Sequence, residues 1–222
     1  EILREPFAWG PSPIFPKDQK IWHKFLVIDG DAGTPLTKFD GDFSKHGYLE
    51  YDVTNVAYTL PDVKRAVIIG VGGGRDLMSA KYFGVEEVTA LDVNPVQIKL
   101  LTENEEYRSY TQLYNQPGVQ ILNEEARSWF RQNDKKYDLV QMSLIDTWAA
   151  TGAGAFALSE NGLYTAEAWG VFMNDLSDHG VFTLSRWSAN AVDDTGRSLS
   201  VAMATLFNQG AENPRDHIVM VN

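Results

Sequence analysis

A run of glycines, Gly70-Val71-Gly72-Gly73-Gly74-Arg75-Asp76, directly follows the short apolar segment at residues 66–69. Glycine takes positive φ values without steric penalty and lets a ligand approach the backbone, so the run predicts a ligand-binding turn between a strand and a helix. The dinucleotide fingerprint G-x-G-x-x-G is not met, because Arg75 occupies its sixth position. The pattern G-x-G-x-G is typical of folds that bind a nucleoside without a pyrophosphate, namely S-adenosylmethionine (SAM). A purely structural glycine turn is the alternative.

Acidic residues follow the next two predicted strands. Asp92 lies 22 residues after Gly70, near the spacing of about 20 residues expected for a carboxylate that binds ribose hydroxyls. Glu124 and Glu125 follow the third strand, where a side chain can accept a hydrogen bond from an adenine amino group. The structural alternatives are a helix cap for Asp92, a role that Asn94 could also fill, and a solvated first helical turn for the two glutamates.

Ligands of open α/β sheets bind beyond the carboxyl ends of the strands, where all of these residues are expected to lie. The sequence therefore predicts a nucleoside site that is formed by the glycine turn and by the acidic residues after the second and third strands. Its predicted members are Gly70, Gly72, Gly74, Arg75, Asp92, Glu124 and Glu125.

The sequence from Arg65 onward has the pattern of a sheet that would position these residues. Continuous apolar runs, typical of strands buried on both faces, alternate with helical segments. We predict strands at residues 66–69, 88–91, 119–122, 137–141, 181–184 and 217–221, and helices at 76–83, from Pro95, at 126–132, 165–177 and 198–207. This alternation predicts an α/β fold with a doubly wound, mostly parallel sheet and helices on both faces.

The first 60 residues differ in character. Four prolines among the first sixteen residues predict an extended arm, because proline fixes φ and lacks a backbone N–H. Residues 24–28 predict a strand that runs into a tight turn, and β-prone residues continue up to Tyr58. We therefore divide the chain into an arm with a small antiparallel β unit, residues 1–60, and a SAM-binding type of α/β domain, residues 61–222.

The composition excludes some classes of protein and disfavours some partners. The chain of 222 residues is 44% hydrophobic and 22% charged, which excludes a disordered or low-complexity protein. Its 19 basic and 30 acidic residues give a net charge of −11, which disfavours nucleic acid and favours a small cationic partner. The chain has no cysteine, which fits a reducing compartment such as the cytoplasm, and its four histidines lack the spacing of metal ligands. No apolar run reaches the ~18 residues that a membrane helix needs.

Residues 24–187 resemble the spermidine synthase family, a branch of the class I SAM-dependent methyltransferase fold. The resemblance rests on Ile28-Asp29-Gly30, on residues 69–76, on Leu91-Asp92-Val93-Asn94-Pro95, on Tyr137-Asp138-Leu139-Val140 and on the segment 146–165. It is strongest to the spermidine-synthase-like domains that are fused to membrane segments in bacteria. It implies SAM or decarboxylated SAM as co-substrate and transfer of an aminopropyl group to a small cationic amine or polyamine. Membrane anchoring of a longer protein and a homodimer are left open.

The sequence departs from the family pattern at two places. Family members that make spermidine have an aspartate inside the glycine turn, where this chain has Gly73. They also have two aspartates three residues apart after the fourth strand, and here those positions align with Ser143 and Asp146. The missing carboxylates, together with an Arg75 that could pair with the carboxylate of intact SAM, favour methyl transfer as the alternative reaction.

Candidate acceptor-side residues follow the fourth strand. We predict that Asp146 attracts the acceptor amine and takes its proton, with Ser143 orienting the acceptor, because an amine that arrives as a cation must be deprotonated before it attacks. The uncharged segment 147–159 is predicted to close over the acceptor as a lid. Trp148, Phe156, Glu160 and Tyr164 are predicted to line or support the acceptor pocket.

Three hypotheses follow from the sequence. The first is an aminopropyl transferase, the second a SAM-dependent methyltransferase that acts on a small molecule, and the third a non-catalytic nucleoside-binding domain of a membrane protein. All three predict the same nucleoside site, and no metal is expected in any of them.

Overall fold

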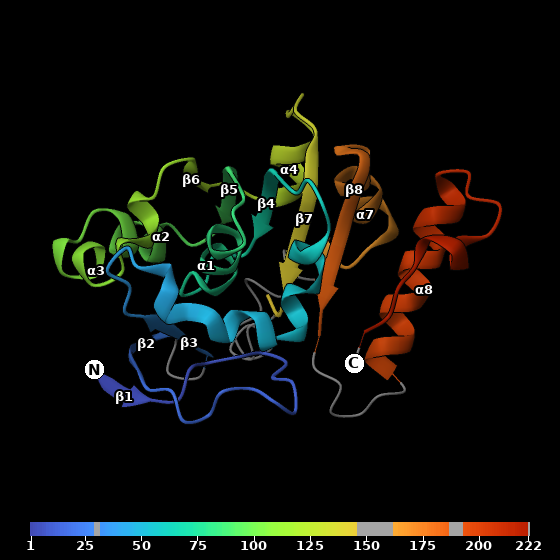
Figure 1. Cartoon of the computed structure of the whole chain (residues 1–222). Helices are drawn as coiled ribbons and strands as arrows, with labels where there is room; N and C mark the ends of the chain where they lie inside the picture. The colour runs from blue at the N-terminus through green and yellow to red at the C-terminus, as the bar shows by residue number, and fades with distance from the viewer. Residues whose placement is uncertain (29–31, 146–161, 187–192, 222) are drawn as a thin grey trace.

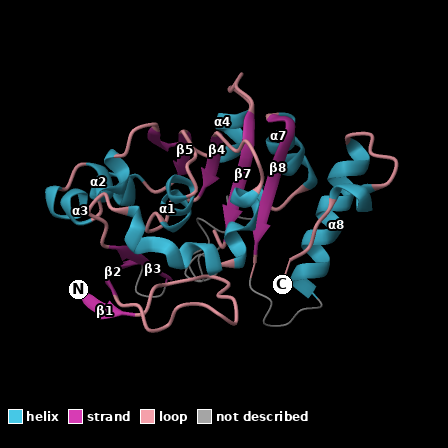
Figure 2. Ribbon diagram, in the orientation of Figure 1, coloured by secondary structure: helices cyan, strands magenta, loops and turns pink. Residues whose placement is uncertain are grey.

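The computed structural model describes residues 1–28, 32–145, 162–186 and 193–221. Five parallel strands form its central sheet (Figures 1 and 2): β4 (Arg65–Ile69), β5 (Glu87–Asp92), β6 (Val119–Asn123), β7 (Tyr137–Ser143) and β8 (Leu176–Ser185). Their order in the sheet is β6-β5-β4-β7-β8, so the chain direction across the sheet reverses between β4 and β7. The predicted doubly wound parallel sheet is confirmed.

Helices cover both faces of this sheet, because its strands are apolar on both sides. Along β4, Ala66 and Ile68 belong to one core cluster, and Val67 and Ile69 belong to the other. The first cluster contains residues of α1 (Arg75–Tyr82), α2 (Pro95–Thr102) and α3 (Glu105–Tyr110), and the second contains residues of α4 (Ala126–Phe130) and α7 (Ala166–Asn174) together with partly buried residues of α8 (Asp193–Asn208).

The N-terminal unit contains a small antiparallel sheet, as predicted. Its strands are β1 (Ile2–Arg4), β2 (Ile21–Ile28) and β3 (Ala32–Thr37). In Figure 1 this sheet lies on the side toward which β4, β7 and β8 run, so it covers the carboxyl edge of the central sheet.

The expected continuation of β structure up to Tyr58 was wrong. This segment forms two 3-10 helices instead, η1 (Phe43–Tyr51) and η2 (Val53–Thr59). The side chain of Asp42 accepts a hydrogen bond from the backbone N–H of Ser44, and that of Asp52 accepts one from Thr54. These local caps favour turns over the β-propensity of the neighbouring residues.

The predicted sixth strand at residues 217–221 was also wrong. Pro214–His217 form the short 3-10 helix η4, and the described residues after it pair with no strand. Val219 is 86% exposed, so the β-prone residues here lack the neighbouring strand that a ladder requires.

Several boundaries of helices and strands also differ from the prediction. Helix α7 ends at Asn174 rather than near residue 177, because Leu176 already pairs with Tyr137 at the start of β8. A 3-10 helix, η3 (Gln112–Asn115), precedes β6. Within the described ranges, no helix has both the length and the apolar character needed to cross a bilayer.

Candidate functional site

The glycine turn lies at the carboxyl end of β4, beside the point where the strand order reverses. Gly70, Gly72 and Gly74 have φ values of +86°, +51° and +82°, in the left-handed region that other residues rarely adopt. Gly74 is also the N-cap of α1, so the free N–H groups of that helix begin where the turn ends. The turn thus has the backbone that the sequence predicts for a ligand-binding loop.

Three side chains from other elements hold the turn in place. The Oδ2 of Asp92 accepts a hydrogen bond from the backbone N–H of Val71 at 3.0 Å. Gln97 of α2 donates through Nε2 to the carbonyl of Gly72 at 2.6 Å. The third is Thr34 of β3, whose Oγ1 accepts from the N–H of Gly73 at 2.8 Å. Sequence reasoning missed Thr34 and Gln97, since neither belongs to a motif.

Gly73 has no room for a side chain. A Cβ added there would lie 2.0 Å from the carbonyl oxygen of Pro35 in β3. Any larger residue at this position would therefore require β3 to move. The aspartate that the family resemblance leads one to expect in the turn is excluded here by the N-terminal sheet.

Arg75 is a member of a buried ion pair. Its Nη2 donates to Oδ2 of Asp52 at 2.6 Å, its Nη1 donates to the hydroxyl of Ser79, and its Nε donates to the carbonyl of Phe7 at 3.4 Å. The side chains of Arg75 and Asp52 are 6% and 0% exposed. The expected contact with a donor carboxylate stays a prediction, and it would require Arg75 to give up this ion pair.

Asp92 ends β5, with both of its oxygens directed at the backbone. Oδ1 accepts from the N–H of Asn94 at 2.9 Å, opposite the contact of Oδ2 with the glycine turn. Burial raises the pKa of Asp92, and its hydrogen bonds from Asn94 and the glycine turn partly offset that effect. The cap of α2 is Asn94, not Asp92, so Asp92 keeps lone pairs for a ligand at this partly exposed position.

The two glutamates after β6 have different positions. Glu125 caps α4, where its carboxylate accepts hydrogen bonds from the backbone N–H groups of Arg127 and Ser128. Burial alone would raise the pKa of Glu125, but these hydrogen bonds and that from the Ser128 hydroxyl lower it. Glu124 is exposed, and its N–H donates to the carbonyl of Asp92 at 3.1 Å. Both glutamates therefore follow directly on the strand that neighbours Asp92, as predicted.

Ser143 is the last residue of β7 and lies on the far side of the strand reversal from Asp92. It is 9% exposed, and its Oγ accepts from Nε2 of Gln141 at 3.0 Å. Its hydroxyl lowers the pKa of Asp76, an acidic residue of the first turn of α1. Sequence reasoning assigned no role to Asp76, although its place directly after the glycine turn was a usable signal.

The remaining acceptor-side predictions fall mostly outside the described residues. These are Asp146, Trp148, Phe156 and Glu160, together with the predicted lid at 147–159. Tyr164 is described, and its ring lies under the guanidinium of Arg186, with 4.5 Å between Cζ and the ring centroid. One face of this aromatic ring is thus already occupied by a cation of the protein itself.

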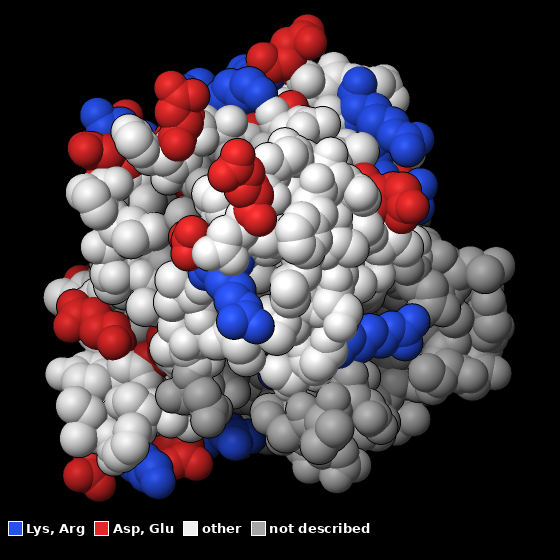
Figure 3. All heavy atoms as spheres, turned by 90° about the vertical axis from the view of Figure 1, so that its right-hand side faces the viewer, with Lys and Arg blue, Asp and Glu red and all other residues white. Residues whose placement is uncertain are grey.

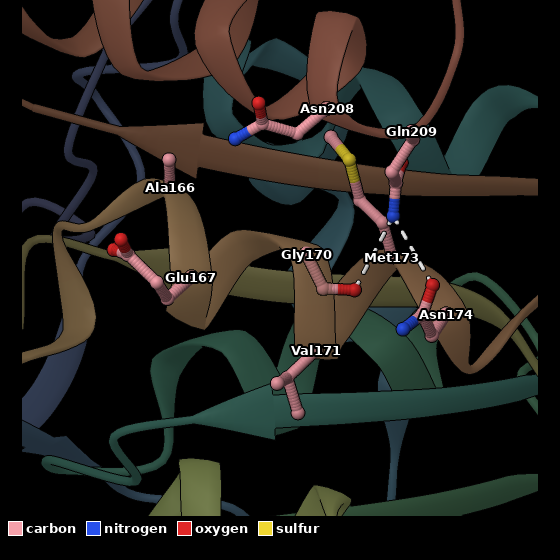
Figure 4. A pocket seen from close by; sticks show the side chains of 8 residues that line it. All are labelled: Ala166, Glu167, Gly170, Val171, Met173, Asn174, Asn208 and Gln209. Carbon is pink, nitrogen blue, oxygen red and sulfur yellow. Dashed lines mark hydrogen bonds between the residues drawn. The ribbon is translucent and has the colours of Figure 1, made fainter.

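A surface groove lies between α7 and α8 (Figure 4). It is lined by Ala166, Glu167, Gly170, Val171, Met173, Asn174, Asn208 and Gln209. Gln209 bridges it by donating to the carbonyl of Gly170 and to Oδ1 of Asn174. No predicted site residue lines this groove, which is a seam between two helices.

Charged side chains of both signs are dispersed over one face of the molecule (Figure 3). On the face shown in Figure 3, acidic and basic side chains are scattered around a broad uncharged area. Among the described residues, no group of three or more histidine, cysteine, aspartate or glutamate side chains is arranged to hold a metal ion.

No family model and no curated protein sequence matches the chain. Solved structures do: a spermidine synthase in complex with the transition-state analogue AdoDATO matches with a TM-score of 0.56 and 18% identity, over 91% of this chain and 64% of that one. Spermidine synthase from Thermotoga maritima matches with a TM-score of 0.52 and 18% identity, over 91% and 62%. A SAM-dependent methyltransferase from Agrobacterium tumefaciens has a TM-score of 0.46 and 17% identity, over 83% and 58%.

The chain thus spans less than two thirds of the length of each of these proteins. At such low identity the likeness establishes the fold. The chain has a Rossmann-like α/β fold that it shares with spermidine synthase, and it also contains the small N-terminal sheet.

Proposed function

We propose that this protein is a transferase that uses a SAM-type sulfonium nucleoside and alkylates a small cationic amine. One observation carries the proposal. A left-handed glycine turn and the carboxylate of Asp92, hydrogen-bonded to each other, lie at the strand reversal where open α/β sheets bind their ligands. The fold shared with spermidine synthase supports the same class of donor.

The residues present fit such a nucleoside. Four of the five residues from Gly70 to Gly74 are glycines, so a ligand can approach the backbone of the turn closely. Asp92 is partly exposed and has acceptor capacity left for ribose hydroxyls, while Glu125 is the candidate for the adenine amino group. When bound, the nucleoside supplies an alkyl group on a positively charged sulfur that can leave as a neutral thioether.

On the acceptor side the protein has to attract a cation and deprotonate it. Asp146 is our candidate for this role, three residues after the end of β7 at Ser143. Trp148, Glu160 and Tyr164 are candidates for the wall of the acceptor pocket. If Asp146 acts as the base, Asp146→Asn should lower turnover by ~10²–10⁴-fold and leave nucleoside affinity nearly unchanged.

The transferred group is either aminopropyl, as the likeness to spermidine synthases suggests, or methyl. One observation favours intact SAM and hence methyl transfer. In the family, an aspartate at this position holds the amine of decarboxylated SAM, a donor without a carboxylate. An aspartate cannot replace Gly73 here, because Pro35 lies against Gly73. The hydroxyl of Thr34 accepts from Gly73 N–H, so its own hydrogen is available to donate to a donor carboxylate.

Calorimetry with four ligands tests the proposal: SAM, decarboxylated SAM and the thioether product of each. We expect nucleoside binding, with a preference for SAM and S-adenosylhomocysteine if the methyl alternative holds. A preference for the decarboxylated pair would favour aminopropyl transfer. Binding of none of the four would refute the proposed function, and binding without turnover of any amine would favour a non-catalytic nucleoside-binding domain.

A further inference from the structure

Asp76 is a buried acid with an unused oxygen. Asp76 is 6% exposed, and its Oδ1 has no hydrogen-bond partner in the described part of the chain. Arg75, the neighbouring cation, is engaged with Asp52. A buried carboxylate without full compensation is unfavourable for folding, so a protein seldom keeps one without a function.

A chain of hydrogen bonds ends beside this carboxyl group. Tyr58 of η2 donates to Oε1 of Gln141 in β7, whose Nε2 donates to Oγ of Ser143 at 3.0 Å. The Ser143 hydroxyl in turn lies near enough to Asp76 to lower the pKa of its carboxyl. The chain of hydrogen bonds thus runs from Tyr58 to Ser143, and the Ser143 hydroxyl at its end stabilises the ionised form of Asp76.

The position of this group is that of a ligand site. Asp76 lies in the first turn of α1, two residues after the glycine turn, and Ser143 ends β7 on the other side of the strand reversal. Leu144 follows with a φ of +48°, a strained conformation for a leucine. Such strain is concentrated at functional sites, where the surrounding structure maintains it.

We propose that Asp76 Oδ1 binds the ammonium group of the acceptor amine and takes its proton, an inference that rests on the proposed function. Before reaction the acceptor is R–NH₃⁺ and Asp76 is a carboxylate. Transfer of one proton gives R–NH₂, whose lone pair is then free to attack, and a neutral carboxylic acid held by Ser143. Burial raises the pKa of Asp76 to about 6, which makes it a stronger base than an ordinary carboxylate but leaves it mostly ionised at pH 7.

This assignment moves the proton-accepting role from Asp146, the candidate named from the sequence, to Asp76, and leaves Asp146 as a group that attracts the cation. Ser143 is a positioning residue that fixes the Asp76 carboxyl, and Asp76 is the group that contacts the amine. Tyr58 and Gln141 act through Ser143 by fixing its hydroxyl rotamer.

Calorimetry on the protein loaded with S-adenosylhomocysteine tests the proposal, with 1,4-diaminobutane and n-butylamine as probes and 1,4-butanediol as the neutral comparison. We expect the amines to bind and the diol not to bind. Asp76→Asn should weaken amine binding about tenfold or more, because a charge-assisted hydrogen bond is lost. The nucleoside affinity should stay within about twofold, since the turn keeps its contacts with Asp92.

The matched control is Asp138→Asn, the same substitution at the opposite end of β7. Asp138 accepts from the backbone N–H groups of Lys64 and Arg65, away from the carboxyl edge. This variant should bind the amines as the parent does. Equal amine affinity in Asp76→Asn and the parent would overturn the inference, as would failure of the loaded parent to bind either amine. Failure of the parent to bind any SAM-type nucleoside would instead overturn the proposed function.

A second variant keeps the inference testable if Asp76→Asn does not fold. Ser143→Ala removes the hydroxyl that lowers the pKa of Asp76, so this pKa should rise further. Amine binding should then reach its half-maximal value at a higher pH than in the parent. An unchanged pH profile would show that Asp76 does not contact the amine.

Discussion

Two aspartates near Arg75, Asp52 and Asp76, are both buried but differ in how many hydrogen bonds their carboxylates accept. Asp52 accepts from the N–H groups of Trp9, Gly10 and Thr54, from the Thr54 hydroxyl and from Arg75, so both of its oxygens are fully used. Asp76, 6% exposed, has one oxygen without a partner among the described residues.

The difference separates a carboxylate with a structural role from one to which we assign a functional role in our proposal. Asp52 joins the N-terminal arm, η2 and α1, and has no lone pair to offer a ligand. Asp76 contributes less to holding elements together and retains acceptor capacity at the edge where ligands bind. Charge and burial are similar at the two sites, so hydrogen-bond satisfaction is the property that separates them.

The largest effect is expected from Asp52. Asp52→Ala leaves the guanidinium of Arg75 buried without its counter-charge and removes the anchor of the N-terminal arm. The free energy of unfolding should fall by about 3–5 kcal/mol, as measured by urea denaturation.

Asp40→Ala is the control, because Asp40 forms an exposed ion pair with Lys45. Its denaturation midpoint should hardly change. An Asp52→Ala protein as stable as Asp40→Ala would show that the buried pair is not a structural anchor.

The next largest effect is expected on the pH dependence of the free energy of unfolding, to which Asp76 contributes. Burial raises its pKa to about 6 in the folded state, so the protonated form is favoured by folding. Its contribution to stability is present below pH ~4 and is lost as the pH rises through ~6. Asp76→Asn stays neutral throughout, so it should gain up to ~3 kcal/mol of stability relative to the parent between pH 4 and pH 8.

Urea denaturation of both proteins across this range measures the difference. The charged and titratable neighbours of Asp76 are Arg75, Asp52 and Tyr58, and they are present in both proteins. His46, whose pKa burial lowers to about 4, titrates in the same range and cancels in the comparison. A stability difference that does not vary with pH would mean that Asp76 ionises as freely as an exposed aspartate.

Asp92 is intermediate between the two cases, since backbone N–H groups satisfy it in part while it stays partly exposed. Asp92→Ala should reduce the affinity for S-adenosylhomocysteine by ~2–3 kcal/mol through loss of a carboxylate–diol contact. Glu87→Ala, at the exposed opposite end of β5, is the control in calorimetry and should bind as the parent does. Equal affinities would place the ribose elsewhere.

The smallest effect is expected at Glu125, which caps α4. Glu125→Ala should cost about 1 kcal/mol of stability, whereas Glu125→Ser should restore most of it, because serine also caps helices well. If Glu125 also contacts adenine, both variants should bind S-adenosylhomocysteine more weakly. Retention of full affinity in Glu125→Ser would leave Glu125 as a cap alone.

The central sheet could be predicted from the sequence because its strands are buried on both faces. Residues 88–91 were predicted as a strand and β5 spans Glu87–Asp92, and the first strand ends where the glycine run begins. The turn could be predicted as well, because a backbone with positive φ favours glycine and so appears in the sequence as a glycine-rich run.

The features that escaped prediction depend on contacts between distant segments. Arg75 and Asp52 are 23 residues apart, and Thr34 meets Gly73 across 39 residues. The sequence shows which side chains are polar but not which groups they pair with, so the unpaired oxygen of Asp76 could not be predicted either. Residues 217–221 illustrate the same limit, since a strand needs a partner as well as β-propensity.

The contact between Gly73 and Pro35 makes the glycine turn an interface as well as a candidate ligand site. Residues of the N-terminal unit lie over Gly73, so the two predicted domains would share one wall of the proposed nucleoside site. A fragment that begins after residue 60 would contain the whole glycine motif but neither Thr34 nor Pro35. Protein engineering that aims to change the donor should therefore redesign β3 together with the turn, because a substitution in either one alters the docking of the other.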